Sequence, residues 1–202
     1  GLNHKVYRPL EKNDSELVKF KKELFKGKEF DFVMLFNSRN IRRKMIPDTI
    51  FAYKLFIDKL PREQAKKCAF VLHTAKVDPN GTDLPAVIEA LCGDDDRYNF
   101  IFTENTLDVE GMNRLYNSTD VQIQLTSNEG WGLTITEAML TGTPFIANVT
   151  GGMQDQMRFV DENGKWFTPS PDVPSNHRGT YKEHGEWVFP VFPTSRSIQG
   201  SP

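Results

Sequence analysis

The stretch VQIQLTSNEGWGLTITEAMLTGTPFIANV, residues 121–149, decides the fold. The apolar alternation at residues 121–126 predicts a strand. Residues 133–140 predict a helix that stops at Gly142, where a left-handed cap is easiest, and residues 144–149 predict a second strand. A strand, a helix and a second strand in this order indicate one β-α-β unit of a parallel sheet.

The earlier part of the chain repeats this alternation. Apolar runs predict three more strands, at residues 30–36, 68–75 and 98–103. Helices are predicted after them, at residues 48–60, 83–92 and 108–119. Five strands that alternate with helices predict an α/β fold, a Rossmann-like doubly wound parallel sheet with helices on both faces. Sheets of this kind bind ligands at the carboxyl ends of their strands.

The character of the sequence changes near residue 160. Residues 161–202 are rich in proline and have no clear period, so we expect an irregular appendage, partly ordered by Trp187, Phe189 and Phe192. The expected organisation is a lead-in at residues 1–29, a Rossmann-like domain at 30–160 and the appendage. Because the chain opens without methionine and stops in SIQGSP, we expect a fragment of a longer protein.

The bulk composition excludes several classes of protein. The chain has 202 residues, a net charge of -2 and 38% hydrophobic residues, which is ordinary for a soluble globular domain. There is no basic excess that would indicate nucleic-acid binding. No apolar run approaches the roughly 20 residues that a membrane-spanning helix needs.

Two glutamates, Glu129 and Glu137, stand eight positions apart around the glycines Gly130 and Gly132. Eight residues of helix would separate them by about 12 Å, more than the roughly 5–9.5 Å between carboxyl groups that act on one glycosidic bond. They are better placed to hold the two ends of an extended ligand, such as a diphosphate at the helix N-terminus with a ribose beside it. The alternative is that both are solvated charges and the glycines only shape a turn.

A basic loop follows the first predicted strand. Its sequence, NSRNIRRKM, contains Arg39, Arg42, Arg43 and Lys44. Cations at the carboxyl end of a strand can neutralise a diphosphate in the same crevice, with arginine binding bidentately and lysine as a point charge. The alternative is a solvated basic loop.

These residues carry a resemblance to a known family. Glu129 to Pro144 resembles E-G-[FW]-G-L-x-x-x-E-A-[ML]-x-x-G-x-P, the E-x7-E signature of retaining glycosyltransferases with the GT-B fold. The family's G-R-L-x-x-x-K pattern is matched at Arg39 and Lys44, with Ser38 in place of the glycine. Gly151-Gly152 resembles the family's glycine pair, and GLNHKVYRP resembles its linker between two domains.

The resemblance implies that this chain is the C-terminal, donor-binding half of a GT-B enzyme that transfers a sugar, with hexoses expected, from a nucleotide-diphosphate sugar. Arg39 and Lys44 would stabilise the departing diphosphate, and Glu129 would hydrogen-bond sugar hydroxyls. Glu137 would hold the ribose. The backbone around the loop would approach the sugar and phosphates; its residues are Gly130, Trp131, Gly132, Leu133 and Thr134.

The same resemblance implies a metal-independent enzyme without a cofactor, the nucleotide sugar being a substrate. Its acceptor would bind mostly to a missing N-terminal domain, and any membrane contact would be made through that half. We expect a cytoplasmic location, or the cytoplasmic face of a membrane, where activated sugars are made. The alternative function is a non-catalytic module that binds a nucleotide sugar in the same crevice. An oxidoreductase is disfavoured because NSRNIRRK stands where a G-x-G-x-x-G turn would be.

Overall fold

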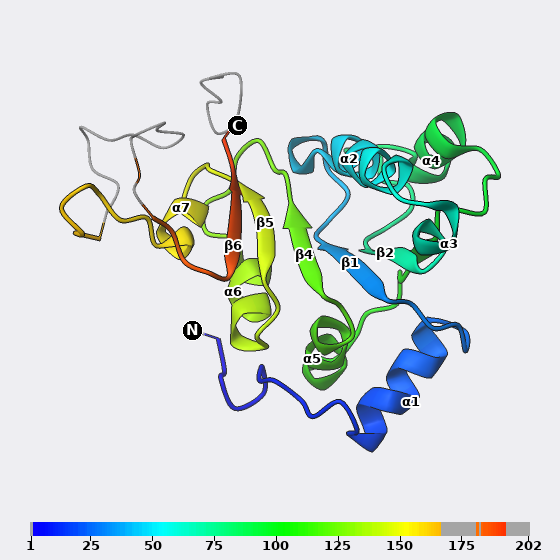
Figure 1. Cartoon of the computed structure of the whole chain (residues 1–202), viewed down its shortest axis with the longest axis horizontal. Coiled ribbons are helices and arrows are strands. Elements are labelled where there is room, and N and C mark those ends of the chain that lie inside the picture. The colour runs from blue at the N-terminus through cyan, green and yellow to red at the C-terminus, as the bar shows by residue number, and fades with distance from the viewer. Residues whose placement is uncertain (1, 167–180, 182, 193–202) are drawn as a thin grey trace.

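The computed structural model describes residues 2–166, 181 and 183–192. These residues form a sheet of six parallel strands in the order β3-β2-β1-β4-β5-β6 (Figure 1). The strands are β1 (Phe32–Asn37), β2 (Cys68–His73), β3 (Phe100–Phe102), β4 (Val121–Gln124), β5 (Phe145–Asn148) and β6 (Val188–Val191). The order reverses between β1 and β4, and this switch point is where a doubly wound sheet opens a crevice for a ligand.

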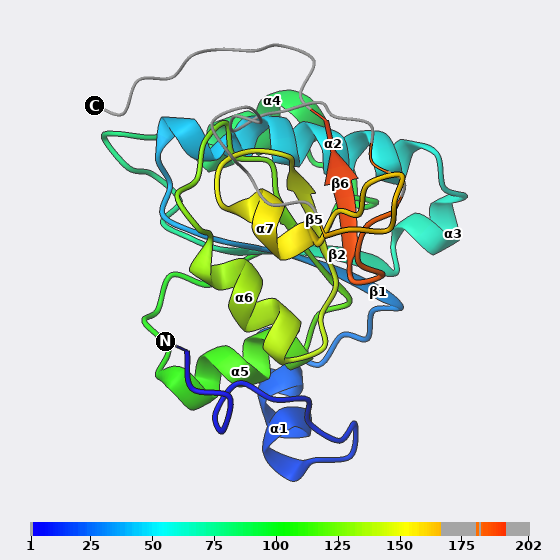
Figure 2. The ribbon, with the colours of Figure 1, turned by 90° about the vertical axis from the view of Figure 1, so that its left-hand side faces the viewer.

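Helices cover both faces of the sheet (Figure 2). They are α1 (Ser15–Leu24), α2 (Ile46–Asp58), α3 (Arg62–Ala65), α4 (Leu84–Cys92), α5 (Val109–Asn117), α6 (Leu133–Leu140) and α7 (Met153–Met157), with a short 3-10 turn η1 (Arg42–Lys44) before α2. The helices α2 and α4 lie on one face, while α5, α6 and α1 lie on the other. The predicted α/β doubly wound fold is therefore confirmed.

The strands alternate their side chains between two cores. Met34 and Phe36 of β1 pack with α2 and α4, whereas Val33 and Leu35 pack with α5 and α6. All four are buried. A strand buried on both faces reads as a continuous apolar run, which is why β1 was predictable from its sequence.

One expectation was wrong. Residues 188–191 lie in the segment expected to be irregular, yet they form β6, which pairs in parallel with β5. The N–H groups of Phe145 and Val149 donate to the carbonyls of Trp187 and Val191, both at 2.9 Å. Pro190 falls between these acceptors, where β5 needs no donor from it, so a proline is tolerated in this edge strand.

The expected lead-in contains a helix, α1, that was not predicted, and neither was the four-residue α3. Helix α1 begins at the N-cap Asp14, whose side chain accepts a hydrogen bond from the backbone N–H of Leu17. The rest of the expected irregular segment, residues 167–180, 182 and 193–202, lies outside the described residues. No helix in the described part of the chain is both long and apolar enough to cross a membrane.

Candidate functional site

The loops that follow β1 and β4 meet at the switch point. The carbonyl of Arg43, in the first loop, accepts hydrogen bonds from the backbone N–H of Ser127 and the hydroxyl of Thr126, both at 2.9 Å. The hydroxyl of Thr126 also lies 2.9 Å from the carbonyl of Asn128. Hydrogen bonds to the Arg43 carbonyl therefore hold the basic loop directly against the start of the glycine-rich loop.

Side chains join the same two loops. Lys44 donates a short hydrogen bond to Oε2 of Glu129, and a guanidinium nitrogen of Arg43 lies 3.1 Å from the same oxygen. Arg43 also donates to the carbonyl of Asn128 at 2.8 Å. The side chains of Lys44 and Glu129 are only 8% and 14% exposed, whereas that of Arg43 is 43% exposed. The carboxylate is therefore held by one buried and one half-exposed cation.

The local charges decide the ionisation of Glu129. Burial raises the pKa of this carboxyl group, but hydrogen bonds and charges from Lys44 and Arg43 outweigh it, so the pKa lies below its usual value. Burial also lowers the pKa of Lys44, against the raising effect of the hydrogen bond and charge of Glu129. At neutral pH, Glu129 is therefore a carboxylate.

Arg39 does not contact Glu129, unlike Lys44 and Arg43. Its side chain is 65% exposed and pairs with Asp78, in the loop after β2, at 3.1 Å. Next to it, Asn40 is buried and bonds to the backbone of Thr82 in both directions and to the carbonyl of Ala75. Lys44 and Arg43 thus lie against Glu129, whereas Arg39 does not. The sequence placed Arg43 in the basic loop but assigned it no role.

The glycine-rich loop leads into α6 through a left-handed residue. Gly132 is the N-cap of α6 and has a φ of 83°, a conformation that L side chains rarely adopt. A Cβ at Gly130 would meet no atom within 4 Å, so the backbone there is open to a ligand. Leu133 is exposed and Thr134 half-buried at the first turn of α6. The free N–H groups of this turn favour an anion.

The glycine pair at the start of α7 lies tightly under this loop. A Cβ at Gly151 would lie 1.9 Å from the carbonyl oxygen of Glu129, and one at Gly152 would lie 2.1 Å from that of Gly130. The N–H of Gly152 lies within hydrogen-bonding distance of both carbonyls, at 3.2 and 3.1 Å. Only glycine allows this close approach.

Glu137 is bound by phenols rather than by cations. The hydroxyl of Tyr116, which is fully buried, donates to Oε2 of Glu137 at 2.6 Å and accepts from Nδ2 of Asn37 at 2.8 Å. Burial, together with the charge and a hydrogen bond of Glu137, raises the pKa of Tyr7 to about 12. Tyr7 belongs to the segment that resembles an inter-domain linker, so this segment contacts the second glutamate of the signature.

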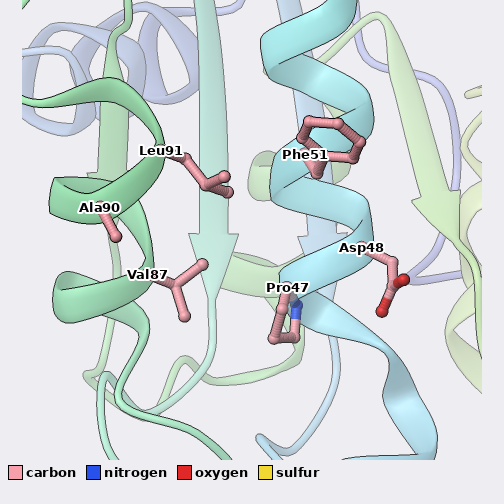
Figure 3. A pocket seen from close by; sticks show the side chains of 6 residues that line it. All are labelled: Pro47, Asp48, Phe51, Val87, Ala90 and Leu91. Carbon is pink, nitrogen blue, oxygen red and sulfur yellow. The ribbon is translucent and has the colours of Figure 1, made fainter.

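Two hollows lie apart from this arrangement. One of about 370 Å³ lies between α2 and α4 (Figure 3), lined by Pro47, Asp48, Phe51, Val87, Ala90 and Leu91. One of about 730 Å³ runs along β3, with walls that include Phe20, Lys26, Lys76, Phe100 and Glu104. Neither contains a predicted site residue, and the first is almost wholly apolar. The candidate site is the cluster at the switch point.

The fold and the site together define a doubly wound α/β domain with a cation-bound carboxylate and a glycine-rich helix start at its switch point. The family model of the glycosyl transferases group 1 matches residues 45–176. The chain belongs to this family.

The chain is also similar to part of a curated enzyme. The chain is 31% identical over 116 residues to trehalose synthase from Pyrococcus horikoshii. The match covers 56% of this chain and 27% of the relative, so the chain spans only about a quarter of that protein.

Solved structures are similar in fold. The C-terminal domain of the group 1 glycosyl transferase LpcC from Francisella tularensis is 21% identical with a TM-score of 0.60, over 84% of this chain and 81% of that one. Sucrose-phosphate synthase from Thermosynechococcus elongatus is 22% identical with a TM-score of 0.55, over 76% of this chain and 35% of that one. Anabaena HepE, solved in complex with UDP and glucose, is 20% identical with a TM-score of 0.54, over 77% and 38% of the two chains.

Proposed function

We propose that this chain is the donor-binding half of a retaining glycosyltransferase, and that it holds a nucleotide-diphosphate sugar at the carboxyl ends of β1 and β4. The observation that carries the proposal is the carboxylate of Glu129, bound by Lys44 and Arg43 beside the N-terminus of α6. A carboxylate accepts hydrogen bonds from sugar hydroxyls, while cations and free N–H groups bind phosphate. One small region therefore offers groups for both parts of the donor.

The chemical step needs stabilisation of the leaving group. As the bond between the anomeric carbon and the diphosphate oxygen breaks, negative charge develops on that oxygen. We assign the stabilisation of this negative charge to Lys44, Arg39 and the first N–H groups of α6. The acceptor oxygen forms its bond on the face that the diphosphate leaves, and its proton passes to the departing phosphate oxygen, which gives retention without a protein nucleophile. With the charge met by these groups, we propose a reaction that needs no metal.

The remaining assignments follow the family resemblance. Glu137 is proposed to bind the ribose hydroxyls. The backbone of residues 130–134 is proposed to contact the sugar and the phosphates. The side chain of Trp131, in this loop, is exposed. We assign acceptor binding to a preceding N-terminal domain, and the reaction to the cytoplasm or the cytoplasmic face of a membrane. The sugar that is transferred is proposed to be a hexose.

Calorimetry of the chain with UDP, GDP, ADP and their sugar conjugates tests this proposal. One nucleotide family should bind saturably, and both Lys44→Gln and Glu137→Gln should weaken binding at least tenfold. The control is Lys66→Gln, because Lys66 pairs with Asp96 on the surface; it should bind like the unaltered chain. Absence of binding by the folded chain, or equal binding by all variants, would overturn the proposal.

A second measurement addresses the reaction itself. A longer protein that carries this chain and an acceptor domain is incubated with the nucleotide sugar that binds, and the anomeric proton of the product is followed by NMR. Retention predicts the same anomer in donor and product. An inverted product would contradict the retaining assignment, and binding without any turnover would favour the non-catalytic module.

A further inference from the structure

A buried glutamine on α7 closes a ring of hydrogen bonds around the glycine-rich loop. Gln156 is 5% exposed, and its Oε1 accepts from the hydroxyl of Thr136 at 2.7 Å. The same hydroxyl accepts from Nε1 of Trp131 at 2.9 Å. The amide Nε2 of Gln156 then donates back to the carbonyl of Trp131 through a short bond, with the carbonyl of Gly132 at 3.5 Å.

The donors and acceptors of this ring are consistent in direction. The indole of Trp131 donates to Thr136, Thr136 donates to the amide oxygen, and the amide nitrogen donates to the backbone of Trp131. To close the ring, one side chain on α7 must both accept and donate a hydrogen bond. The amide of Gln156 does both. A glutamate would set a carboxylate against the Trp131 carbonyl. A leucine would leave the Trp131 carbonyl without the donor from Gln156 and the Thr136 hydroxyl without its acceptor.

The helix that carries Gln156 is itself fixed from two sides. The indole nitrogen of Trp187, just before β6, donates to the backbone carbonyl of Gln156 at 3.0 Å. At the other end of α7, Gly151 and Gly152 lie against the carbonyls of Glu129 and Gly130. The edge of the sheet, α7 and the glycine-rich loop thus form one connected support.

We propose that Gln156 is a positioning residue for the donor site: it holds the backbone of Trp131 and Gly132 in the conformation that receives the nucleotide sugar. It acts through the loop, without touching the ligand. The ligand in this inference rests on the proposed function, whereas the ring of hydrogen bonds does not.

The ring is tested first, without ligand, by the indole N–H resonance of Trp131 in the ¹⁵N-labelled chain. Thr136→Val should move this proton upfield, because it removes the acceptor of the indole N–H. Gln156→Leu should move it in the same direction, because Thr136 loses the acceptor that orients its hydroxyl. Gln154→Leu is the matched control, because Gln154 is also buried on α7 but donates to the carbonyl of Gly151; its Trp131 resonance should stay in place. An unmoved resonance in both ring variants would overturn the inference.

Positioning is tested by the affinity of the folded variants for UDP, GDP and ADP. Gln156→Leu and Thr136→Val should each weaken the nucleoside diphosphate that the unaltered chain binds by about tenfold. The double variant should be no weaker than either single one, since both break the same ring. A merely structural role would lower the melting temperature and leave the affinity of the folded chain unchanged, which would refute the positioning role.

The two proposals fail in different ways. If the unaltered chain binds none of the three nucleotides, the proposed function and the positioning role both fall. If the unaltered chain binds one of them and Gln156→Leu binds it equally well, only the positioning role falls.

Discussion

The phenol of Tyr116 donates a 2.6 Å hydrogen bond to Oε2 of Glu137, 21 residues further along the chain. Its oxygen also accepts from Nδ2 of Asn37 at the end of β1. The second glutamate of the signature is therefore aimed by a buried side chain of α5 and, through it, by the central strand of the sheet. The position of the Glu137 carboxylate is therefore set by buried side chains of the core and not by the glycine-rich loop.

Replacing Tyr116 by phenylalanine should weaken both the fold and the site. The change leaves Asn37 without an acceptor and removes a donor from Glu137, at a cost of about 1–3 kcal/mol in the free energy of unfolding. Nucleotide affinity should fall about threefold to tenfold, because Glu137 loses its orientation. Urea unfolding and calorimetry measure the two effects, and unchanged affinity in a folded Tyr116→Phe chain would show that Glu137 does not contact the ligand.

The two cations at Glu129 should differ in their effect on stability. Lys44→Met leaves a buried carboxylate with one cation fewer, so the free energy of unfolding should fall by about 3 kcal/mol. The side chain of Arg43 is 43% exposed, and Arg43→Met should cost no more than about 1 kcal/mol. Urea unfolding of both variants checks this order; a larger loss for Arg43→Met would show that the half-exposed pair dominates.

The lowered pKa of Glu129 predicts how stability depends on pH. A group whose pKa is lower in the folded chain stabilises it fully above the unfolded value, near 4.5, and loses that contribution as pH falls through the folded pKa. The chain should therefore be more stable than Glu129→Gln at pH 7, and the difference should shrink on acidification below about pH 4.5. Urea unfolding across this range measures it. A difference that is constant with pH would contradict the shift.

Alanine at Gly152 should lower the stability of the fold, whereas alanine at Gly130 should lower nucleotide affinity and leave the stability nearly unchanged. Gly152→Ala places a Cβ 2.1 Å from the carbonyl oxygen of Gly130, which forces the loop and α7 apart and should cost at least about 2 kcal/mol. Gly130→Ala meets no atom within 4 Å, so the free energy of unfolding should change by less than about 1 kcal/mol while nucleotide affinity falls. Thermal unfolding and calorimetry separate the two roles. Unchanged affinity in Gly130→Ala would mean that the ligand does not approach there.

The core strands could be predicted because their sequences are unbroken apolar runs. β1 and β2 are buried on both faces, and each gives a continuous signal in the sequence. β6 gives no such signal, because an edge strand with Pro190 in it looks like a loop. Its existence depends on pairing with β5, a contact between residues about 40 positions apart.

The same distinction explains what was found of the site. The glycine-rich loop and the two glutamates form a local pattern that can be read from the sequence, whereas the contact of Lys44 with Glu129 joins two loops about 85 residues apart and was not predicted. The partners of Glu137 could not be predicted, because Tyr7 and Tyr116 approach it only through the packing of distant segments. Nor could the sequence separate Arg43, which reaches Glu129, from Arg39, which pairs with Asp78. Whether Arg39 turns toward a bound diphosphate stays a prediction.

We propose that the two loops at the switch point bind the nucleotide sugar. This proposal is tested most directly by ¹⁵N NMR of the labelled chain during titration with the nucleotide sugar that calorimetry selects. The chemical-shift changes should concentrate in residues 37–45 and 127–137, the two loops joined by Lys44 and Glu129. Shifts centred instead on the apolar hollow between α2 and α4, or along β3, would contradict it.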